Sequence, residues 1–202
     1  RSLPRFPPLT SNLRTRYRLA YLAGVMGLAV AGVSGARSLS IVIPVYNGAE
    51  SITELVEALE ALNIPGGHEI VLVNDGSPDD TWGRLRQEVA AHSRLVALNM
   101  SRNYGQHNAL LAGIRAARYP LCVTMDDDLQ NPPEEIPKLI AALSPDLDVI
   151  YGAPLSEERS LRRRLPARLT KLVLSRSMNV KVAEHVSTFR LFRTQLREAF
   201  AT

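Results

Sequence analysis

The stretch SIVIPVYNGAESITELVEALEAL, residues 40–62, sets the fold that we expect. It begins with a short run of β-branched and apolar residues up to Val45, which predicts a buried strand. A turn over residues 46–48 ends this strand, and apolar residues then recur at helical spacing over residues 52–62. A strand followed by an amphipathic helix is the unit from which parallel sheets are built.

The same pattern repeats along the chain. The predicted strands lie at residues 40–45, 69–73, 95–98, 121–125 and 149–151, and the predicted helices at residues 52–62, 82–89, 108–117 and 132–143. Apolar strands that alternate with amphipathic helices predict an α/β fold, in which a mainly parallel sheet carries helices on both faces. At 202 residues, one domain is expected.

Composition and charge exclude several classes of protein. With 46% hydrophobic and 22% charged residues, the chain has the balance of a globular protein rather than a disordered one. A single cysteine, Cys122, excludes an internal disulfide framework, and the four histidines lack zinc-ligand spacing. Six of the 24 basic residues lie in residues 1–38, which contain no acid, so the remainder has 18 basic and 20 acidic residues. This balance argues against a nucleic-acid partner.

The N-terminal segment, residues 1–38, is predicted to precede the folded domain of residues 39–202. Residues 1–18 are rich in Pro, Ser and Arg and predict a basic, unstructured arm. Residues 19–36 are uncharged and predict a weakly apolar helix, close to the roughly 20 residues that a membrane span needs. Three interpretations stay open: a membrane-associated helix, a non-native or mis-started extension, and a signal peptide. The opening Arg1 favours a processed product or a fragment.

Polar residues cluster at the carboxyl ends of the predicted strands. Tyr46 and Asn47 follow the first strand, Asp75 follows the second, Asn103 lies beyond the third, and residues 126–130 follow the fourth. In open parallel sheets, ligands bind outside the carboxyl ends of the strands. We therefore expect a binding site at this edge of the sheet.

Three consecutive aspartates, Asp126, Asp127 and Asp128, follow a buried strand. Adjacent carboxylates repel one another, at a cost of the order of several kcal/mol, unless a cation or hydrogen-bond donors compensate. Mg²⁺ typically uses one or two carboxylates together with substrate phosphates, and Gln130 offers a further oxygen ligand. The alternative is a solvated acidic turn that caps the next helix.

Two further motifs are ambiguous when taken alone. Asp75 lies in an Asn-Asp-Gly-Ser-Pro turn, which fits an Asx turn or an acceptor for an N–H group of a nucleotide base. Tyr46, in Pro-Val-Tyr-Asn, fits a half-buried rim residue or a ring that flanks a base.

Taken together, four segments resemble the family 2 glycosyltransferases: IVIPVYN at 41–47, VNDGS at 73–77, RNYGQH at 102–107 and MDDDLQNPPEEIP at 125–137. Within that family, the chain is most similar to the polyprenyl-phosphate and dolichyl-phosphate sugar transferases, over about residues 39–200. The resemblance implies a GT-A fold (a Rossmann-like α/β fold), a nucleoside-diphosphate sugar donor, a divalent metal and inversion at the anomeric carbon. It favours UDP over GDP as the nucleotide.

The resemblance also assigns roles to individual residues. The residues expected to bind the nucleotide sugar are Pro44, Tyr46, Val73, Asp75, Asp126, Asp127 and Asp128. Asp126 and Asp127 would contact the ribose and the diphosphate, and Asp128 and Gln130 would hold Mg²⁺ or Mn²⁺. Asp126 and Asp128 are the expected catalytic residues.

A basic segment at residues 157–176 carries seven basic residues against two acidic ones. A solvated helix face is one interpretation, and binding of phosphate and anionic lipid is another. The resemblance favours the second, with Arg163 and Arg164 at the phosphate of the acceptor. Residues 187–192 resemble the segment that closes the site from the other side.

The chain departs from the family pattern at three positions near the site. Pro154 stands where many relatives place an arginine close to the diphosphate. Gly48 stands where many relatives have an acidic residue, and Asp127 replaces a commoner small residue. Relatives also continue beyond the position of Thr202, so we expect the catalytic domain to be incomplete at its C-terminus.

The implied function is transfer of a sugar from a nucleoside-diphosphate sugar to a polyprenyl phosphate, in cell envelope biogenesis at the cytoplasmic face of the membrane. A lipid phosphate is already anionic, so it needs orientation more than a general base. The partners expected are the nucleotide sugar, the lipid phosphate and the membrane surface, with homo-oligomerisation left open. The alternatives are a nucleotide-sugar-binding remnant without transfer activity, and a transferase to a saccharide hydroxyl, which needs a general base.

Overall fold

A computed structural model of the chain describes residues 19–22, 37–152 and 188–200. The strands are β1 (Leu19–Leu22), β2 (Leu39–Val45), β3 (His68–Asn74), β4 (Leu95–Asn99), β5 (Leu121–Thr124), β6 (Val149–Gly152) and β7 (Arg190–Arg193). The α-helices are α1 (Ile52–Glu60), α2 (Thr81–Ala91), α3 (Gln106–Ala116) and α4 (Ile136–Ala142), and the 3-10 helices are η2 (Pro133–Glu135) and η5 (Thr194–Phe200).

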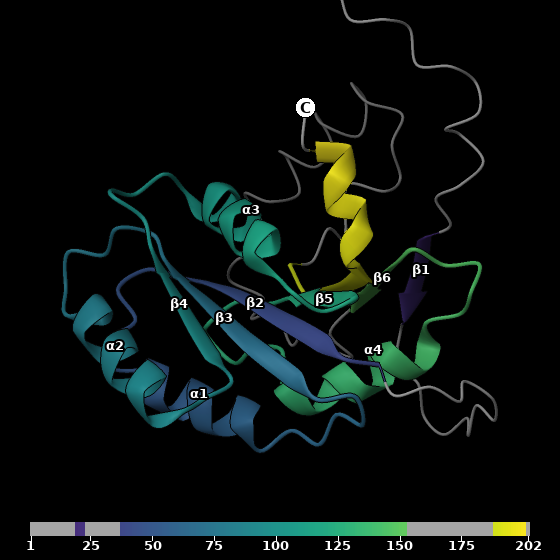
Figure 1. Ribbon diagram of the computed structural model, residues 1–202, viewed down its shortest axis with the longest axis horizontal. Coiled ribbons are helices and arrows are strands. Elements are labelled where there is room, and N and C mark those ends of the chain that lie inside the picture. The colour runs from purple at the N-terminus through teal and green to yellow at the C-terminus, as the bar shows by residue number, and fades with distance from the viewer. Residues whose placement is uncertain (1–18, 23–36, 153–187, 201–202) are drawn as a thin grey trace, which may run out of the picture.

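The strands form one sheet in the order β1-β6-β7-β5-β2-β3-β4 (Figure 1). All neighbouring strands are parallel except β7, which runs antiparallel to both β5 and β6. Helices α1, α2 and α4 pack on one face of the sheet, and α3 packs on the other. The predicted α/β fold, with a mainly parallel sheet covered on both faces, is confirmed.

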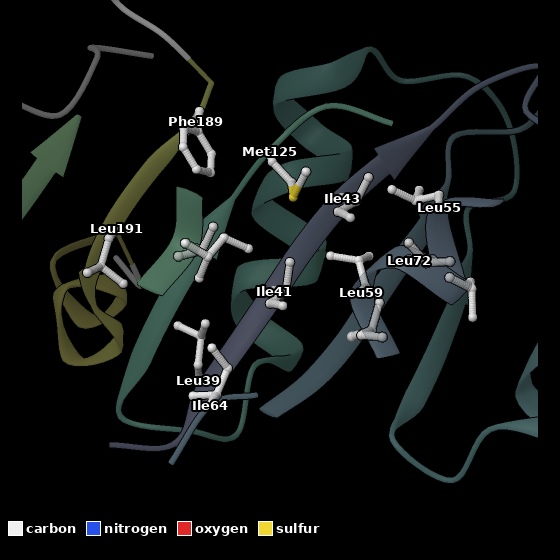
Figure 2. Packing of buried hydrophobic residues seen from close by; sticks show 14 of the residues in the cluster. Leu39, Ile41, Ile43, Leu55, Leu59, Ile64, Leu72, Met125, Phe189 and Leu191 are labelled. Atoms are coloured by element: carbon white, nitrogen blue, oxygen red, sulfur yellow. The ribbon is translucent and has the colours of Figure 1, made fainter. Parts of the chain in front are cut away.

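Strand β2 lies at the centre of the core. All seven of its residues are buried, which explains why its sequence is a continuous apolar run rather than an alternating one. Ile41 and Ile43 lie beside Leu55 and Leu59 of α1 in one hydrophobic cluster (Figure 2), whereas Val42 belongs to the cluster under α3. The carboxyl ends of β2, β3 and β5 are therefore fixed by packing on both faces.

The structure corrects one part of the N-terminal prediction. Leu19–Leu22, expected in a weakly apolar helix, forms strand β1 and pairs in parallel with β6. The pairing supplies backbone hydrogen-bond partners along an otherwise open edge of β6. These hydrogen bonds outweigh the local sequence pattern that predicted a helix. The rest of the expected arm and helix, residues 1–18 and 23–36, lies outside the described residues.

A further finding concerns membrane insertion. Of the helices in the described part of the chain, none has the length and apolar character needed to cross a membrane.

At the amino-terminal end of the sheet, the buried Glu69 carboxylate joins three segments. Ser40 of β2 donates to its Oε1 at 2.6 Å, and the backbone N–H and Nε of Arg118, which precedes β5, donate to its two oxygens at 2.7 and 2.6 Å. Burial by itself would raise the pKa of Glu69, but these hydrogen bonds and the Arg118 charge together hold it below the ordinary value. The carboxylate therefore stabilises the fold in its ionised form.

We predict that Glu69→Gln lowers the free energy of unfolding at pH 7 by about 1–3 kcal/mol, because the buried Ser40 hydroxyl and the N–H groups of Arg118 lose a charged acceptor. The folded-state pKa is depressed, so the stabilisation is present above the unfolded-state value of 4.5 and is lost as the pH falls through the folded-state pKa. Urea unfolding at pH 7 and near pH 3 measures this difference. The difference in the free energy of unfolding between the wild type and the variant should be smaller at the lower pH.

The matched control is Glu57→Gln, since Glu57 is exposed on α1. Its stability should stay within about 0.5 kcal/mol of the wild type. Equal losses in the two variants, or a gap for Glu69→Gln that does not change with pH, would contradict the role of the buried carboxylate.

Candidate active site

A cavity of about 400 Å³ opens at the carboxyl ends of β2, β3 and β5. Its lining residues are Pro44, Val45, Tyr46, Asp75, Asn103, Gly105, Gln106, Asp126, Asp127 and Asp128. The volume lies in the usual range for small-molecule sites. The prediction that polar residues following separate strands gather at one edge of the sheet is confirmed.

The turn that carries Tyr46 is held by side chains from the segment between β3 and α2. The backbone N–H groups of residues 47–49 donate to Ser77 Oγ, Thr81 Oγ1 and the Asp79 carboxylate, at 3.0, 2.9 and 3.3 Å. Hydrogen bonds from Thr81 contribute most to holding the pKa of Asp79 below its ordinary value. These contacts fix the turn while the ring of Tyr46 stays 47% exposed at the cavity.

Asp75 is a nearly buried carboxylate at the end of β3. Its side chain is 2% exposed, and its Oδ1 accepts a hydrogen bond from the backbone N–H of Tyr104 at 2.8 Å. Its own N–H donates to the Val45 carbonyl at 2.9 Å, which ties it to β2. A carboxylate placed in this way presents acceptor atoms to the cavity in a fixed position.

Gly76, the next residue, allows the segment before α3 to pack against this turn. Its φ is +65°, and a Cβ at this position would lie 2.3 Å from the carbonyl carbon of Arg102 and 2.4 Å from the Asn103 nitrogen. The backbone of Asn103 and Tyr104 can therefore reach Asp75 only because position 76 has no side chain.

Asp126 is held from two sides. Gln106, at the start of α3, donates from Nε2 to Asp126 Oδ1 at 2.5 Å, and Thr188 donates from Oγ1 to Asp126 Oδ2. Thr188 is itself placed by Thr124 of β5, whose Oγ1 donates to the Thr188 carbonyl at 2.6 Å. Thr188 belongs to residues 187–192, whose closure of the site stays a prediction, and Ser187 lies outside the described residues.

Asp127 and Asp128 complete the acidic group. Burial, together with the charges of Asp128 and Asp126, raises the pKa of Asp127 above its ordinary value. Asp128 is exposed, and its Oδ1 accepts the backbone N–H of Gln130 at 3.1 Å. Leu129, between Asp128 and Gln130, adopts a left-handed φ of +55°, so the chain turns directly after the three aspartates.

Two of the departures from the family pattern, Gly48 and Asp127, lie next to each other. A Cβ at position 48 would lie 3.4 Å from Asp127 Oδ2 and 2.5 Å from Val45 Cγ1. A larger residue at position 48 would therefore crowd Val45, and an acidic one would add a like charge beside Asp127. Glycine at position 48 and aspartate at position 127 are compatible with each other.

Some of the predicted site residues are not brought into the cavity. Val73 is fully buried and packs under α3, because side chains alternate along a strand and Val73 faces that cluster; its role at the nucleoside stays a prediction. Gln130 contributes its backbone N–H to Asp128 but does not line the cavity, so its role as a metal ligand stays a prediction. Arg163 and Arg164 lie outside the described residues.

Sequence reasoning missed two residues that contact Asp126. Gln106 lies in the RNYGQH segment, whose likeness to the family carried no individual role. Thr188 lies in the 187–192 segment, which was expected to close the site, but its contact with Asp126, 62 residues away, was not predicted. Both could have been found only from the packing of α3 and β7 beside β5.

Comparison with known proteins fits this arrangement. The family model described as "Glycosyl transferase family 2" matches residues 40–200. The chain belongs to this family. Its expected membership, drawn from the four sequence segments, is confirmed.

Curated relatives resemble the chain over most of its length. The undecaprenyl-phosphate 4-deoxy-4-formamido-L-arabinose transferase of Pseudomonas aeruginosa (strain LESB58) is 42% identical over 165 residues, which cover 80% of this chain and 48% of that protein. The protein of the same name from Pseudomonas fluorescens (strain Pf0-1) is 39% identical with the same coverage. The chain spans about half the length of these relatives.

Solved structures share the fold. A mannosyltransferase from Pyrobaculum calidifontis, in complex with GDP-Man and Mn²⁺, has a TM-score of 0.61 at 18% identity. The match covers 83% of this chain and 47% of the mannosyltransferase chain. Glucosyl-3-phosphoglycerate synthase from Mycobacterium tuberculosis, in complex with Mn²⁺, UDP and glucosyl-3-phosphoglycerate, has a TM-score of 0.58 at 21% identity. That match covers 79% of this chain and 58% of the synthase chain. The expected GT-A fold is confirmed.

The close packing at Gly76 gives a testable prediction. Gly76→Ala should lower the free energy of unfolding by about 1–2 kcal/mol for the left-handed backbone, and by about a further 1–3 kcal/mol because the backbone at Arg102 and Asn103 must move. Gly67→Ala is the matched control, since Gly67 also has a positive φ, of +74°, but has no heavy atom within 4 Å of the added Cβ.

Urea unfolding of both variants measures the difference. We expect Gly76→Ala to lose clearly more stability than Gly67→Ala. The same loss in both would mean that the segment before α3 does not rest on Gly76.

Proposed function

We propose that this chain carries the donor-binding site of an inverting glycosyltransferase, which transfers a sugar from a nucleoside-diphosphate sugar to a polyprenyl phosphate. The observation that carries the proposal is the placement of Tyr46, Asp75 and the three aspartates around one cavity of a GT-A fold. Support for the lipid acceptor comes from the relatives, which are named as undecaprenyl-phosphate transferases. Their lipid acceptor also supports a place at a membrane, for which we propose the cytoplasmic face.

The nucleoside would occupy the end of the cavity formed by β2 and β3. An ionised carboxylate accepts hydrogen bonds and donates none, so Asp75 suits a base with a ring N–H group, such as uracil or guanine. The half-exposed ring of Tyr46 would lie against the base. We propose UDP rather than GDP on the resemblance of the motifs.

The acidic residues fit a divalent cation that is shared with the substrate. In residues 37–152 and the other described segments, no three His, Cys, Asp or Glu side chains form a metal-binding group. Mg²⁺ does not require one, since it is commonly bound by one or two carboxylates plus phosphate oxygens. The pKa of Asp127 is raised by burial first and then by the like charges of Asp128 and Asp126, and a cation would offset those charges. Asp128, with Gln130 as a further candidate, would hold Mg²⁺ or Mn²⁺.

In this proposal the residues of the site have separate roles. Asp126, oriented by Gln106 and Thr188, and its neighbour Asp127 would contact the ribose and the diphosphate. The bound metal would neutralise the negative charge of the departing nucleoside diphosphate. An acceptor phosphate is already anionic and needs no general base, so alignment with the anomeric carbon is the main requirement. Arg163 and Arg164 remain the residues proposed for that phosphate.

The proposal predicts that Asp128→Asn weakens Mn²⁺-dependent binding of the nucleotide by at least about tenfold, because the metal loses a charged ligand. Calorimetric titration with UDP and with GDP, each with and without Mn²⁺, measures the effect and identifies the base. The wild type should bind one of the two nucleotides more tightly when the metal is present.

Asp146→Asn is the matched control, since Asp146 is exposed in the segment before β6, at the opposite end of the strands. It should bind like the wild type. Metal-dependent binding that survives unchanged in Asp128→Asn would remove Asp128 from the metal site. A wild type that binds neither nucleotide would overturn the donor assignment.

A further inference from the structure

Asn103, between β4 and α3, is one of the polar residues that line the nucleotide cavity. Its backbone nitrogen packs against the turn after β3, since a Cβ on Gly76 would lie 2.4 Å from it. The next residue, Tyr104, donates its backbone N–H to Asp75, whereas Gln106 already reaches the acidic end of the cavity. Asn103 therefore lies at the nucleoside end, beside Asp75.

One hydrogen bond fixes the orientation of the Asn103 side-chain amide. Its Oδ1 accepts the backbone N–H of Gly105 at 2.9 Å. The amide nitrogen could not take that place, because it is itself a donor. Nδ2 is therefore on the other side of the amide, and no described residue accepts a hydrogen bond from it. Its two N–H groups are available to a ligand in the cavity.

The carboxylate of Asp75 is held in a similar way. Its Oδ1 accepts the N–H of Tyr104 at 2.8 Å, which leaves Oδ2 to accept a hydrogen bond from a ligand. The backbone of residues 103–104 rests on the turn at residues 75–76, so the two side chains are neighbours at one end of the cavity. A fixed acceptor from Asp75 is thus placed next to a fixed donor from Asn103.

The edges of the four common bases differ in the order of donors and acceptors. Uracil and guanine carry a ring N–H group next to a carbonyl oxygen, which complements an acceptor next to a donor. Cytosine and adenine carry a ring nitrogen that accepts next to an amino group that donates, which is the reverse order. The pair of groups at this end of the cavity therefore matches the first two bases and opposes the other two.

We propose that Asn103 is a specificity-determining residue, which donates from Nδ2 to the carbonyl oxygen beside the ring N–H that Asp75 accepts. The inference rests on the proposed function, because it needs a nucleotide in this cavity. A base with the reversed edge would set donor against donor at Asn103 and acceptor against acceptor at Asp75. This repulsion, as much as the matched hydrogen bonds, excludes cytosine and adenine.

Calorimetric titration of the full chain with UDP, CDP, GDP and ADP, each with Mn²⁺, tests the inference. The wild type should bind UDP or GDP at least about tenfold more tightly than CDP and ADP. Asn103→Asp keeps an oxygen for the Gly105 N–H but replaces the donor by an acceptor. It should reduce the preference for UDP over CDP, or for GDP over ADP, by about tenfold or more. The added negative charge alone would weaken all four nucleotides alike and leave this ratio unchanged.

The double variant Asp75→Asn/Asn103→Asp exchanges the two groups and keeps the net charge of the wild type. The Tyr104 N–H should still hold the oxygen of the new amide, so that its nitrogen donates to the ligand. We expect this variant to bind CDP more tightly than UDP, or ADP more tightly than GDP. Asn63→Asp is the matched control, since Asn63 is exposed after α1, at the opposite end of the strands, and it should bind like the wild type.

The outcomes separate this inference from the proposed function. A wild type that binds UDP or GDP but does not distinguish them from CDP and ADP, or an unchanged ratio in folded Asn103→Asp, would reject the role of Asn103 and leave the donor site intact. Asn103→Ala, which removes the amide without adding a charge, is a second variant if circular dichroism shows that Asn103→Asp does not fold. A wild type that binds none of the four nucleotides would reject the proposed donor site, and the role of Asn103 with it.

Discussion

Two hydrogen bonds to one carboxylate join three distant segments of this protein. Gln106 of α3 and Thr188, just before β7, donate to the two oxygens of Asp126, at the end of β5. The donors offset part of the repulsion among three neighbouring aspartates and fix the direction of the first of them. Because one donor comes from α3 and the other from the segment before β7, this carboxylate ties both segments to the edge of the nucleotide cavity.

The parts of the fold that the sequence predicts are those with a local cause. β2, β3 and β5 are buried on both faces, so their apolar runs are continuous and easily recognised. Strand β7 reads Arg-Leu-Phe-Arg, too short and too charged to stand out, and it forms because β5 and β6 pair with it on either side. β1 has a similar origin in its pairing with β6.

The residues of the candidate site can be separated on the same basis, into those with a local cause in the sequence and those without one. Asp75 and the aspartates at 126–128 were predictable because each follows a strand, and strand ends share an edge. Val73 was assigned to the nucleoside pocket from its position in the motif. Because side chains alternate along β3, its side chain points into the hydrophobic core under α3. Gln106 and Thr188 act by touching Asp126, and a contact between residues so far apart in the chain has no signature in the sequence.

The strand order also determines how a nascent chain can assemble. β2, β3, β4 and β5 are neighbours in the sheet and are complete once residue 124 has been synthesised, so this block can form early on the ribosome. β6 emerges next, yet it joins the sheet through β7, whose residues emerge later. Until then, β6 and β1 can pair with each other but not with the block. Thr188 reaches Asp126 in that last step, so translation finishes the nucleoside side of the cavity before the second hydrogen bond that holds Asp126.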